Sequence, residues 1–456
     1  MSPLDELMID NNNNRIFIKR DDLVPFSFGG NKVRIAQELI NDMRVHKKNC
    51  IIGYGNSRSN LSRALSNLCY SQGIRCHIIS PADEDGTRVD TYNSILVKKS
   101  NVIIHECLKN NVSQTVEKVL SQCKDDGYDP YYIYGSIYGK GNEAIPVNAY
   151  VKVYNELLTQ FSVLNVEFDY IFLACGTGMT QAGLIAGKRM NKGKEKIIGI
   201  SVARPEEQEV NVIKSFLDSY RKYYYFDYSI GDIIIDDSWL CSGYGKYDER
   251  ITNTIDTMYK QYGIPLDPTY TGKAFHGMLE HLSINGIKGK KVLFIHTGGT
   301  PLFFDYLKNK IHNNYPVTRS YNLEKLVSFL RNVDKQLPVP LSKRVEISKY
   351  AEKILEFGNV LTIEIDNIIA AAVMFYTNDK EKHKGYITLI SCLKSFENNG
   401  YGGLLLKSAE DEARKNGMKY MTLETDLINY KAIAFYSKRK YRIDFVDSKV
   451  HMIKEL

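Results

Sequence analysis

The chain has 456 residues, of which 43% are hydrophobic and 25% charged, a composition typical of a globular protein with two or three domains. Its net charge of +7 is mild for this length and no polybasic run accompanies it, so the sequence gives no case for a nucleic-acid partner. No apolar run approaches about 18 residues, which excludes a membrane span. The eight cysteines show no CxxC pair and no metal spacing, and residues 1–14 do not resemble a signal peptide, so we expect reduced thiols in a cytoplasmic protein.

From residue 49 onward, short apolar strands alternate with amphipathic helices. This alternation predicts an α/β domain with open, largely parallel sheets, where ligands bind at the carboxyl ends of the strands. The expected strands are 50–53, 76–80, 102–105, 131–134, 170–174, 197–202 and 292–296. The expected helices are 59–72, 89–98, 114–123, 148–160 and 181–188.

The composition changes after about residue 316, and a separate α+β unit of ordinary domain size is expected from there. Its expected elements are two helices within 322–351, a hairpin of 360–365 and 368–376, a strand at 386–392, a helix at 400–416, a strand at 420–424 and a helix at 431–438. We therefore place a first domain at residues 1–317 and a second domain at residues 318–456.

Lys32 lies in the stretch Phe28-Gly29-Gly30-Asn31-Lys32, just before residues that repeat apolar positions at helical spacing. The two glycines allow a tight turn, and Asn31 suits the position ahead of a helix. In the first turn of a helix the amide dipoles disfavour a cation, so a desolvated ammonium there loses its proton more readily. A neutral amine can condense with a carbonyl. The alternative is a surface lysine that reaches solvent from an ordinary helix start.

A glycine-rich turn, Gly176-Thr177-Gly178-Met179-Thr180, joins an expected strand to an expected helix. Backbone N–H groups, hydroxyls and a helix start favour phosphate binding at such a turn. Gln181 stands where a dinucleotide fingerprint needs its third glycine, Arg204 stands where it needs an acid, and the turn lacks the Gly-Lys-Ser/Thr of a Walker loop. We therefore expect a cradle for a monophosphate, the alternative being a purely structural turn.

Four further residues offer polar side chains beside expected turns. Ser59 can transfer protons or hold a carboxylate, and Asn60 can bond to a ring oxygen, although both are also ordinary helix-capping residues. Tyr244 and Tyr270 offer phenols next to flexible turns. Together with Lys32 and the phosphate cradle, these residues describe a pyridoxal phosphate site.

Seven segments carry a family resemblance, in this order along the chain: residues 19–23, 29–32, 59–60, 134–136, 176–183, 266–274 and 294–301. Through them the first domain resembles the family of 1-aminocyclopropane-1-carboxylate deaminase and D-cysteine desulfhydrase, which are pyridoxal phosphate enzymes of fold type II. The resemblance implies Lys32 as the Schiff-base lysine, Asn60 on the pyridine hydroxyl and residues 176–180 on the phosphate. It also implies Ser59, Tyr244 and Tyr270 around the substrate. Thr297 is implied to face the ring nitrogen.

Two departures from the family pattern bear on the reaction. Thr271 stands where the deaminase branch has a glutamate that supports the ring nitrogen. Thr271 and Thr297 instead resemble the desulfhydrase branch, whose neutral partners leave the ring unprotonated, and this milder electron sink favours loss of a β-substituent over opening of a cyclopropane. Leu61 replaces the polar residue that usually follows Ser-Asn, so the native amino acid can differ from D-cysteine.

In the second domain, Asn398-Asn399-Gly400-Tyr401-Gly402-Gly403 joins an expected strand to an expected helix and offers amides to a pyrophosphate. With the order of the elements around it, this turn resembles that of the GNAT-type N-acetyltransferases. The resemblance implies acetyl-CoA as cosubstrate, Tyr436 as the acid that protonates the leaving thiolate, and Asn429 near the cofactor arm. Glu397 stands where the family has a basic or amide residue, and Glu424 is one candidate base beside a water relay.

The sequence therefore predicts a bifunctional amino-acid enzyme. Its first domain is expected to use pyridoxal 5'-phosphate for α,β-elimination and deamination of a small amino acid such as D-cysteine, and its second to transfer acetyl groups from acetyl-CoA. The alternatives are β-replacement or racemisation whose product the second domain N-acetylates, a second domain that only binds acetyl-CoA, and a silent binding protein. The expected partners are the amino acid and acetyl-CoA, without nucleic acid or membrane, in a homodimer.

Overall fold

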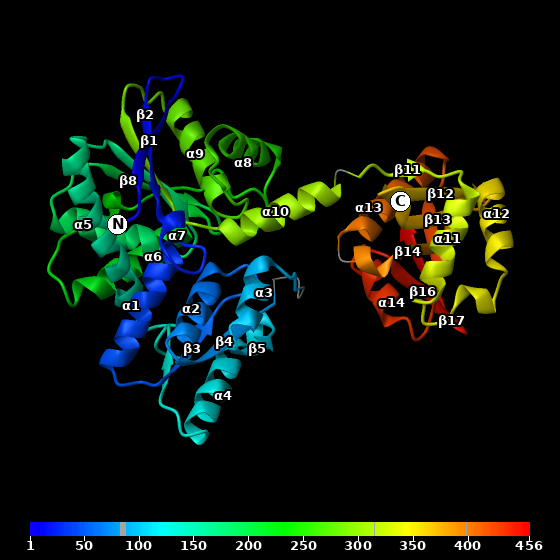
Figure 1. Cartoon of the computed structure of the whole chain (residues 1–456), viewed down its shortest axis with the longest axis horizontal. Coiled ribbons are helices and arrows are strands. Elements are labelled where there is room, and N and C mark those ends of the chain that lie inside the picture. Colours follow the sequence, from blue (N-terminus) through cyan, green and yellow to red (C-terminus); the bar gives the residue numbers. More distant parts are fainter. Residues whose placement is uncertain (83–87, 314, 398) are drawn as a thin grey trace. The chain divides into compact units, whose positions relative to one another are not determined.

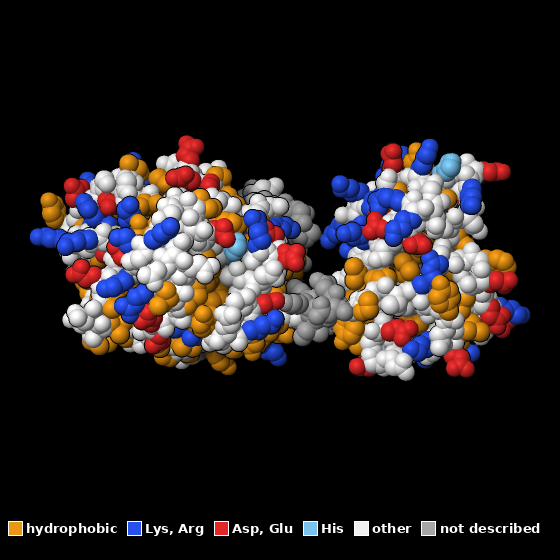
Figure 2. All heavy atoms as spheres, turned by 90° about the horizontal axis from the view of Figure 1, so that it is seen from above, with side chains coloured by type: hydrophobic (Ala, Val, Ile, Leu, Met, Phe, Trp, Pro, Cys, Tyr) orange, Lys and Arg blue, Asp and Glu red, His pale blue; other side chains and the backbone are white. Residues whose placement is uncertain are grey.

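The computed structural model describes residues 1–82, 88–313, 315–397 and 399–456. They group into two compact units, Met1–Tyr306 and Leu307–Leu456 (Figure 1). In the part of the chain described, no helix is long and apolar enough to cross a membrane. On the face of each unit drawn in Figure 2, Lys and Arg side chains are interspersed with Asp and Glu side chains. The domain boundary expected at 317/318 stays a prediction.

The larger sheet of the first unit is parallel except at one edge. Its strand order is β1 (Leu4–Ile9), β2 (Arg15–Arg20), β10 (Lys291–His296), β7 (Tyr170–Cys175), β8 (Lys196–Ser201) and β9 (Ile234–Asp236). β1 runs antiparallel to β2, and the other neighbours pair in parallel. β2 and β10 are far apart in sequence yet pair along their full length, from Arg15↔Lys291 to Arg20↔His296. The sequence analysis did not predict β1, β2 or β9.

The smaller sheet of the first unit is parallel throughout. Its strand order is β5 (Ile103–Cys107), β4 (Arg75–Pro81), β3 (Cys50–Tyr54) and β6 (Pro130–Tyr132). The helices that follow these strands are α2 (Asn60–Ser71), α3 (Tyr92–Lys99) and α4 (Val112–Asp125). The predicted α/β class with parallel sheets is therefore confirmed, with two sheets in this unit.

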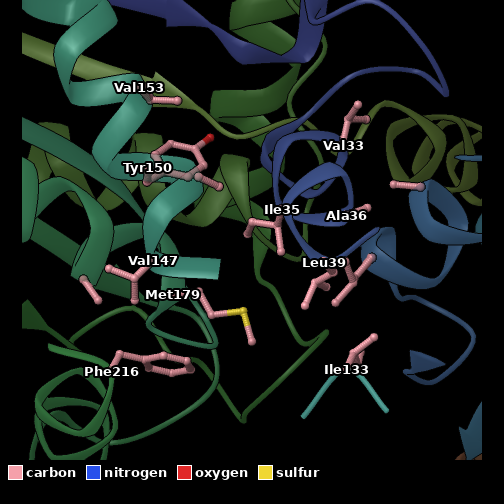
Figure 3. Close-up of a cluster of buried hydrophobic side chains, with 14 of the residues drawn as sticks. Val33, Ile35, Ala36, Leu39, Ile133, Val147, Tyr150, Val153, Met179 and Phe216 are labelled. Carbon is pink, nitrogen blue, oxygen red and sulfur yellow. The ribbon is translucent and has the colours of Figure 1, made fainter. Parts of the chain in front are cut away.

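The main core cluster of the first unit includes buried side chains of α1 (Asn31–Val45), α5 (Ala144–Leu164), α6 (Met179–Met190) and α7 (Glu206–Arg221). α8 (Glu249–Tyr262) packs against α9 (Thr271–Ile284), which packs against β7 and β8, and α10 (Thr300–Asn313) follows β10. In Figure 3, Ile35 of α1, Tyr150 of α5 and Met179 of α6 belong to one cluster of buried side chains. α5 and α6 pack so closely that a Cβ on Gly183 would lie 2.4 Å from the Cβ of Tyr150. This close packing fixes the start of α6, where the phosphate turn is expected.

The second unit contains a mixed sheet with helices on both faces. The strand order is β11 (Thr318–Arg319), β12 (Asn359–Ile365), β13 (Ile368–Asp379), β14 (Lys384–Cys392), β15 (Tyr420–Asp426), β17 (Lys449–Glu455) and β16 (Arg442–Val446). The helices are α11 (Leu323–Asp334), α12 (Ile347–Phe357), α13 (Tyr401–Lys415) and α14 (Tyr430–Ser437). Alternate residues of β13 face opposite sides, because Val373 joins the core beneath α13 whereas Met374 joins the core beneath α11 and α12.

Two strands of this sheet run in parallel for only part of their length. The ladder between β14 and β15 extends from Lys384↔Tyr420 to Ile387↔Leu423. Beyond that pair, β14 continues to Cys392 and β15 continues to Asp426. The remaining neighbours in the sheet are antiparallel.

Candidate active site

The described residues of the first unit enclose a cavity of about 980 Å³. It opens at the carboxyl ends of β3, β4, β7, β8 and β10, where an α/β sheet of this kind places its ligands. The cavity is lined by these residues that the sequence analysis assigned to catalysis or cofactor binding in the first domain: Lys32, Ser59, Asn60, Gly176, Thr177, Gly178, Met179, Thr180, Tyr244, Tyr270 and Thr297.

Lys32 is held against the cavity by a close approach of two loops. Gly30 has φ of +97°, and a Cβ on it would lie 2.9 Å from the carbonyl oxygen of Thr297. The amide of Asn31 donates to that same carbonyl at 3.0 Å. Glycine is needed at position 30 both for the positive φ and for this approach. The lysine and Thr297 are therefore fixed on one wall of the cavity.

Asn31 has a different role from the one expected. Helix α1 begins at Asn31 itself and Gly30 is its N-cap, so Asn31 does not precede the helix. Its side-chain Nδ2 instead donates to Thr180 Oγ1 at 2.9 Å, which joins the lysine loop to the first turn of α6. Burial lowers the pKa of Lys32 to about 8, because desolvation disfavours the ammonium form.

The expected phosphate turn lies between β7 and α6. Gly178 is the N-cap of α6 with φ of +77°, and a Cβ on it would lie 2.8 Å from Ile213 Cγ1 of α7. Arg204 lies beside this turn, where its guanidinium donates to the carbonyl of Gly176 and bonds to Glu209 Oε2 at 2.9 Å. The turn thus offers a helix N-terminus and a neighbouring cation to an anionic group.

Ser59 and Asn60 lie at the start of α2 and also line the cavity. Ser59 is the N-cap, and its Oγ accepts from the amide of Ser62 at 3.1 Å. Asn60 Oδ1 accepts from Asn93 Nδ2 of α3 at 3.0 Å, which fixes the orientation of the Asn60 side chain. The capping geometry therefore coexists with exposure of both side chains to the cavity.

Tyr244 and Tyr270 converge, with their hydroxyls hydrogen-bonded and their ring centroids 5.8 Å apart. Burial raises the pKa of Tyr270, so its phenol keeps its proton at neutral pH. Thr271 is directed elsewhere: its Oγ1 donates to the buried carboxylate of Asp267 at 2.9 Å, and it is not among the described residues that line the cavity. Of the two threonines weighed for the ring nitrogen, Thr297 is the one at the cavity wall.

The sequence analysis missed several cationic side chains of the cavity wall. Arg58, Lys109 and Lys246 line the cavity together with Lys32 and Arg204, and none of its described lining residues is an aspartate or glutamate. Arg58 could have been noticed, because it directly precedes Ser59-Asn60, whereas Lys109 and Lys246 belong to no motif. Such a lining favours phosphate and carboxylate groups.

In the second unit, the expected pyrophosphate turn forms the start of α13. Gly400 is the N-cap with φ of +81°, and Asn399 Nδ2 donates to Phe396 O at 3.1 Å. The side chain of Tyr401 is buried in the core, so only its amide can face a ligand. Asn398 lies outside the described residues.

Helix α14 and the residues after it pack against this turn. A Cβ on Gly402 would lie 3.3 Å from Phe435 Cε2, and one on Gly403 would lie 3.0 Å from Arg439 Nη2. The amide of Gly403 also donates to Gly400 O at 3.0 Å. Arg439 therefore places a cation beside the first turn of α13. The glycine motif alone did not predict this neighbour.

Charged and capping residues complete this region. The Glu397 carboxylate pairs with Lys431 Nζ at 2.9 Å. Burial raises the pKa of Tyr436, so its phenol stays protonated at neutral pH. Asn429 is the N-cap of α14 and accepts from the amide of Ala432 at 3.2 Å.

Glu424, the candidate base, follows the last ladder pair of β14 and β15 directly. Lys449 Nζ donates to Glu424 Oε2 at 2.7 Å. His451 Nδ1 lies 3.7 Å from Glu424 Oε1. The carboxylate is therefore held in an ion pair with Lys449.

Residues 2–298 match the family described as pyridoxal-phosphate dependent enzyme, and residues 329–441 match the acetyltransferase (GNAT) family. A D-cysteine desulfhydrase of Klebsiella pneumoniae is 28% identical over 313 residues, which cover 67% of this chain and 93% of the relative. A D-cysteine desulfhydrase of Yersinia pestis shows the same identity over the same length and coverage.

A crystal structure of an ACC deaminase homologue has a TM-score of 0.59 and 26% sequence identity, covering 68% of this chain and 93% of that one. The pyridoxal-phosphate family implies pyridoxal phosphate as the cofactor of the first unit, and the GNAT family implies acetyl-CoA for the second. The chain belongs to the pyridoxal-phosphate dependent enzymes of fold type II and carries a GNAT acetyltransferase domain at its C-terminal side.

Proposed function

We propose that the first unit catalyses pyridoxal phosphate-dependent α,β-elimination and deamination of a small amino acid such as D-cysteine. The observation that carries this proposal is that Lys32 and the turn at residues 176–180 line one cavity of about 980 Å³. A lysine and a phosphate cradle are the two anchors that the cofactor needs, one for its aldehyde and one for its phosphate. The D-cysteine desulfhydrases among the relatives support the same reaction class.

The residues of the cavity fit this cofactor. Gly176 leaves space beside Tyr270, since a Cβ there would lie 3.7 Å from Tyr270 Cε1 and 3.3 Å from Val202 Cγ2. The start of α6 offers amides to a phosphate. Asn60 and Thr297 both line the cavity with polar side chains, to which the ring hydroxyl and the ring nitrogen are assigned, respectively.

Bound pyridoxal phosphate supplies the electron withdrawal that acidifies the α-proton of an attached amino acid. Lys32 would hold the aldehyde of the cofactor, and it would also take the α-proton, because its lowered pKa keeps part of the amine neutral at physiological pH. The Tyr244–Tyr270 pair, protonated and hydrogen-bonded, donates a proton to the departing β-substituent, and Ser59 holds the substrate. After water is taken up, the products are a 2-oxo acid, ammonia and the protonated β-substituent, which for D-cysteine is hydrogen sulfide.

Reaction choice is the test of this proposal. Because neutral Thr297 rather than an acid lines the cavity, D-cysteine and β-chloro-D-alanine should release pyruvate faster than 1-aminocyclopropane-1-carboxylate releases 2-oxobutyrate. A 2-oxo acid assay on the purified protein measures both rates, with L-cysteine as the control for chirality. The opposite order of rates would rule out the desulfhydrase-like reaction.

The second candidate reaction is β-replacement, with racemisation as a further variant. The cavity volume of about 980 Å³ lies near the top of the usual range of about 300–1,000 Å³ for ligand sites, which favours room for a second reactant. Adding a small thiol or amine to the same assay distinguishes the reactions, because replacement yields a new amino acid at the expense of the 2-oxo acid.

For the second unit, we propose acetyl-CoA-dependent N-acetylation of a small amine. The start of α13 and the neighbouring Arg439 would hold the pyrophosphate, and Tyr436 would protonate the leaving thiolate. The end of the β14–β15 ladder at Ile387↔Leu423 supports this assignment, because strand segments beyond a ladder keep backbone groups for a ligand. Acetylation of the first unit's product, or binding of acetyl-CoA without transfer, are the alternatives.

The same proposal divides the chain at 317/318 and treats it as a cytoplasmic homodimer that binds neither nucleic acid nor membrane. The eight cysteines, all in the described part of the chain, are free thiols, which suits a reducing compartment. Size-exclusion chromatography with light scattering measures the oligomeric state directly.

A further inference from the structure

Three metal-ligating side chains meet at the small sheet of the first unit. Cys50 opens β3, His77 lies in β4, and Cys123 lies in α4, which packs against this sheet. Their side chains are buried, with at most 1% of each residue exposed. The two sulfurs and one ring nitrogen all lie within 4.8 Å of one another. Cys50 is at the opposite end of β3 from Tyr54, so the cluster is separate from the cavity that Tyr54 lines.

Two distances within the cluster match edges of a zinc coordination tetrahedron, and the third pair, Cys50 with His77, lies within 4.8 Å. Cys50 Sγ lies 3.8 Å from Cys123 Sγ, and Cys123 Sγ lies 3.6 Å from His77 Nε2. Two thiolates at about 2.3 Å from a tetrahedral zinc stand about 3.8 Å apart, and a thiolate and an imidazole nitrogen stand about 3.6 Å apart. We propose that Cys50, His77 and Cys123 bind a zinc ion that ties β3, β4 and α4 together.

His105 supports the geometry that such a site requires. Its Nε2 lies 2.9 Å from His77 Nδ1, and the two rings stack with centroids 5.2 Å apart. Ligating histidines usually donate their second ring N–H to a neighbour, which fixes the tautomer and directs the free nitrogen at the metal. With His105 as acceptor, His77 Nε2 is the nitrogen left to face the two sulfurs.

Arg75 is the group that zinc would displace. Its Nε donates to His77 Nε2 at 3.3 Å. Other partners can keep the guanidinium, because Arg75 Nη2 lies 3.8 Å from Asp126 and its Cζ lies 4.6 Å from the centroid of the Tyr128 ring. Zinc binding replaces the Arg75 hydrogen bond, releases the two thiol protons, and leaves a fourth position for one water.

The test is a zinc titration of the full-length protein, loaded with pyridoxal phosphate and kept reduced without a chelating thiol. After dialysis against a chelator, the chain should bind one zinc, and X-ray absorption at the zinc edge should report two sulfurs at about 2.3 Å and nitrogen at about 2.0–2.1 Å. Cys50→Ala and Cys123→Ala should each weaken zinc binding by more than about 100-fold. Cys69→Ala, which removes another buried thiol of the same unit, should not change zinc binding.

His105→Ala gives a readout that does not depend on removing a ligand. It should weaken zinc binding by about 10–100-fold while leaving the circular dichroism spectrum and the cofactor absorbance unchanged. Arg75→Leu should bind zinc at least as tightly as the unchanged chain, since the competing donor is gone. Absence of zinc uptake, a zinc shell without sulfur, or equal affinity in Cys50→Ala and the unchanged chain would each overturn the proposal. If the cysteine variants do not fold, the zinc-edge spectrum of the unchanged chain and the His105→Ala titration decide the question.

Discussion

The reactivity proposed for Lys32 depends on its position in the fold. Lys32 is the second residue of α1, and it lines the cavity. The backbone contact between Gly30 and Thr297 and the Asn31–Thr180 hydrogen bond hold this helix start in place. Desolvation then lowers the lysine pKa to about 8, so the neutral form that can attack an aldehyde is abundant near physiological pH.

The pH dependence of cofactor capture follows from this pKa. For the cofactor-free protein, the rate of covalent attachment should rise with pH and level off above about 8, because Lys32 is then largely deprotonated. An ordinary lysine would keep gaining rate up to about pH 10.4. Mixing the protein with pyridoxal phosphate and following the visible absorbance across this pH range measures the rate.

Two variants make this experiment specific. Lys32→Ala should abolish capture that borohydride can fix, whereas Lys246→Ala, which removes another lysine of the cavity wall, should retain it. Borohydride-fixed cofactor in Lys32→Ala would assign the covalent bond to a different lysine.

Among the helices, strands and loops, close packing contacts hold the candidate site in place. The sequence predicted most strands and helices near the cavity to within a few residues, because apolar periodicity and glycine turns mark them locally. Strand pairings such as β2 with β10 could not be predicted from the sequence, since the two partners lie far apart along the chain. The same limit hid Arg439 beside the start of α13. The hydrogen bond from Thr271 to Asp267 spans only four residues, and it escaped the sequence because it depends on the side-chain orientation at the start of α9.

Gly183 should be the residue of α6 that least tolerates a side chain. A Cβ at this position would lie 2.4 Å from Tyr150 Cβ and 2.6 Å from Val147 O, so α5 and α6 would have to move apart. Gly183→Ala should lower the free energy of unfolding by about 1–3 kcal/mol in urea denaturation. Gly231→Ala is the matched control, since its Cβ would meet only Ser229 Oγ, at 3.7 Å, and should change stability by less than about 0.5 kcal/mol. Equal effects of the two substitutions would contradict close packing of α5 and α6.

The start of α13 gives a second prediction at this scale. Removing the cation beside the first turn, in Arg439→Met, should weaken acetyl-CoA binding by about tenfold, whereas Arg439→Lys should retain most of the affinity. Glu397→Gln should change affinity by less than about twofold, because Lys431 already offsets the carboxylate charge. Calorimetric titration of the full-length variants measures all three. A large gain in affinity from Glu397→Gln would mean that the ion pair does not shield the ligand.

At the scale of the whole molecule, each unit has its own buried core and its own proposed ligand site. The residues that line the large cavity all belong to Met1–Tyr306, and the residues proposed for acetyl-CoA all belong to Leu307–Leu456. Units with separate cores can unfold separately. The two cofactors should therefore stabilise different parts of the chain.

Calorimetric heating should show two unfolding transitions. Acetyl-CoA at about 100 times its Kd should stabilise its unit by about 2.7 kcal/mol and raise one transition by roughly 5–10 °C, while pyridoxal phosphate raises the other. Lys32→Ala should remove only the pyridoxal phosphate effect. One transition that both ligands raise together would show that the units unfold as one.

The pairing of β2 with β10 has a consequence for the growing chain on the ribosome. β10 is made about 270 residues after β2, which at about 5–20 residues per second means a wait of roughly 15–60 s. During that interval one edge of β2 has no neighbour in the sheet, a state in which nascent chains recruit chaperones. Thr297 and Gly298 follow β10 directly, so the cavity is completed by almost the last segment of the unit to leave the ribosome. The first unit can therefore bind its cofactor only after nearly all of its residues have been synthesised.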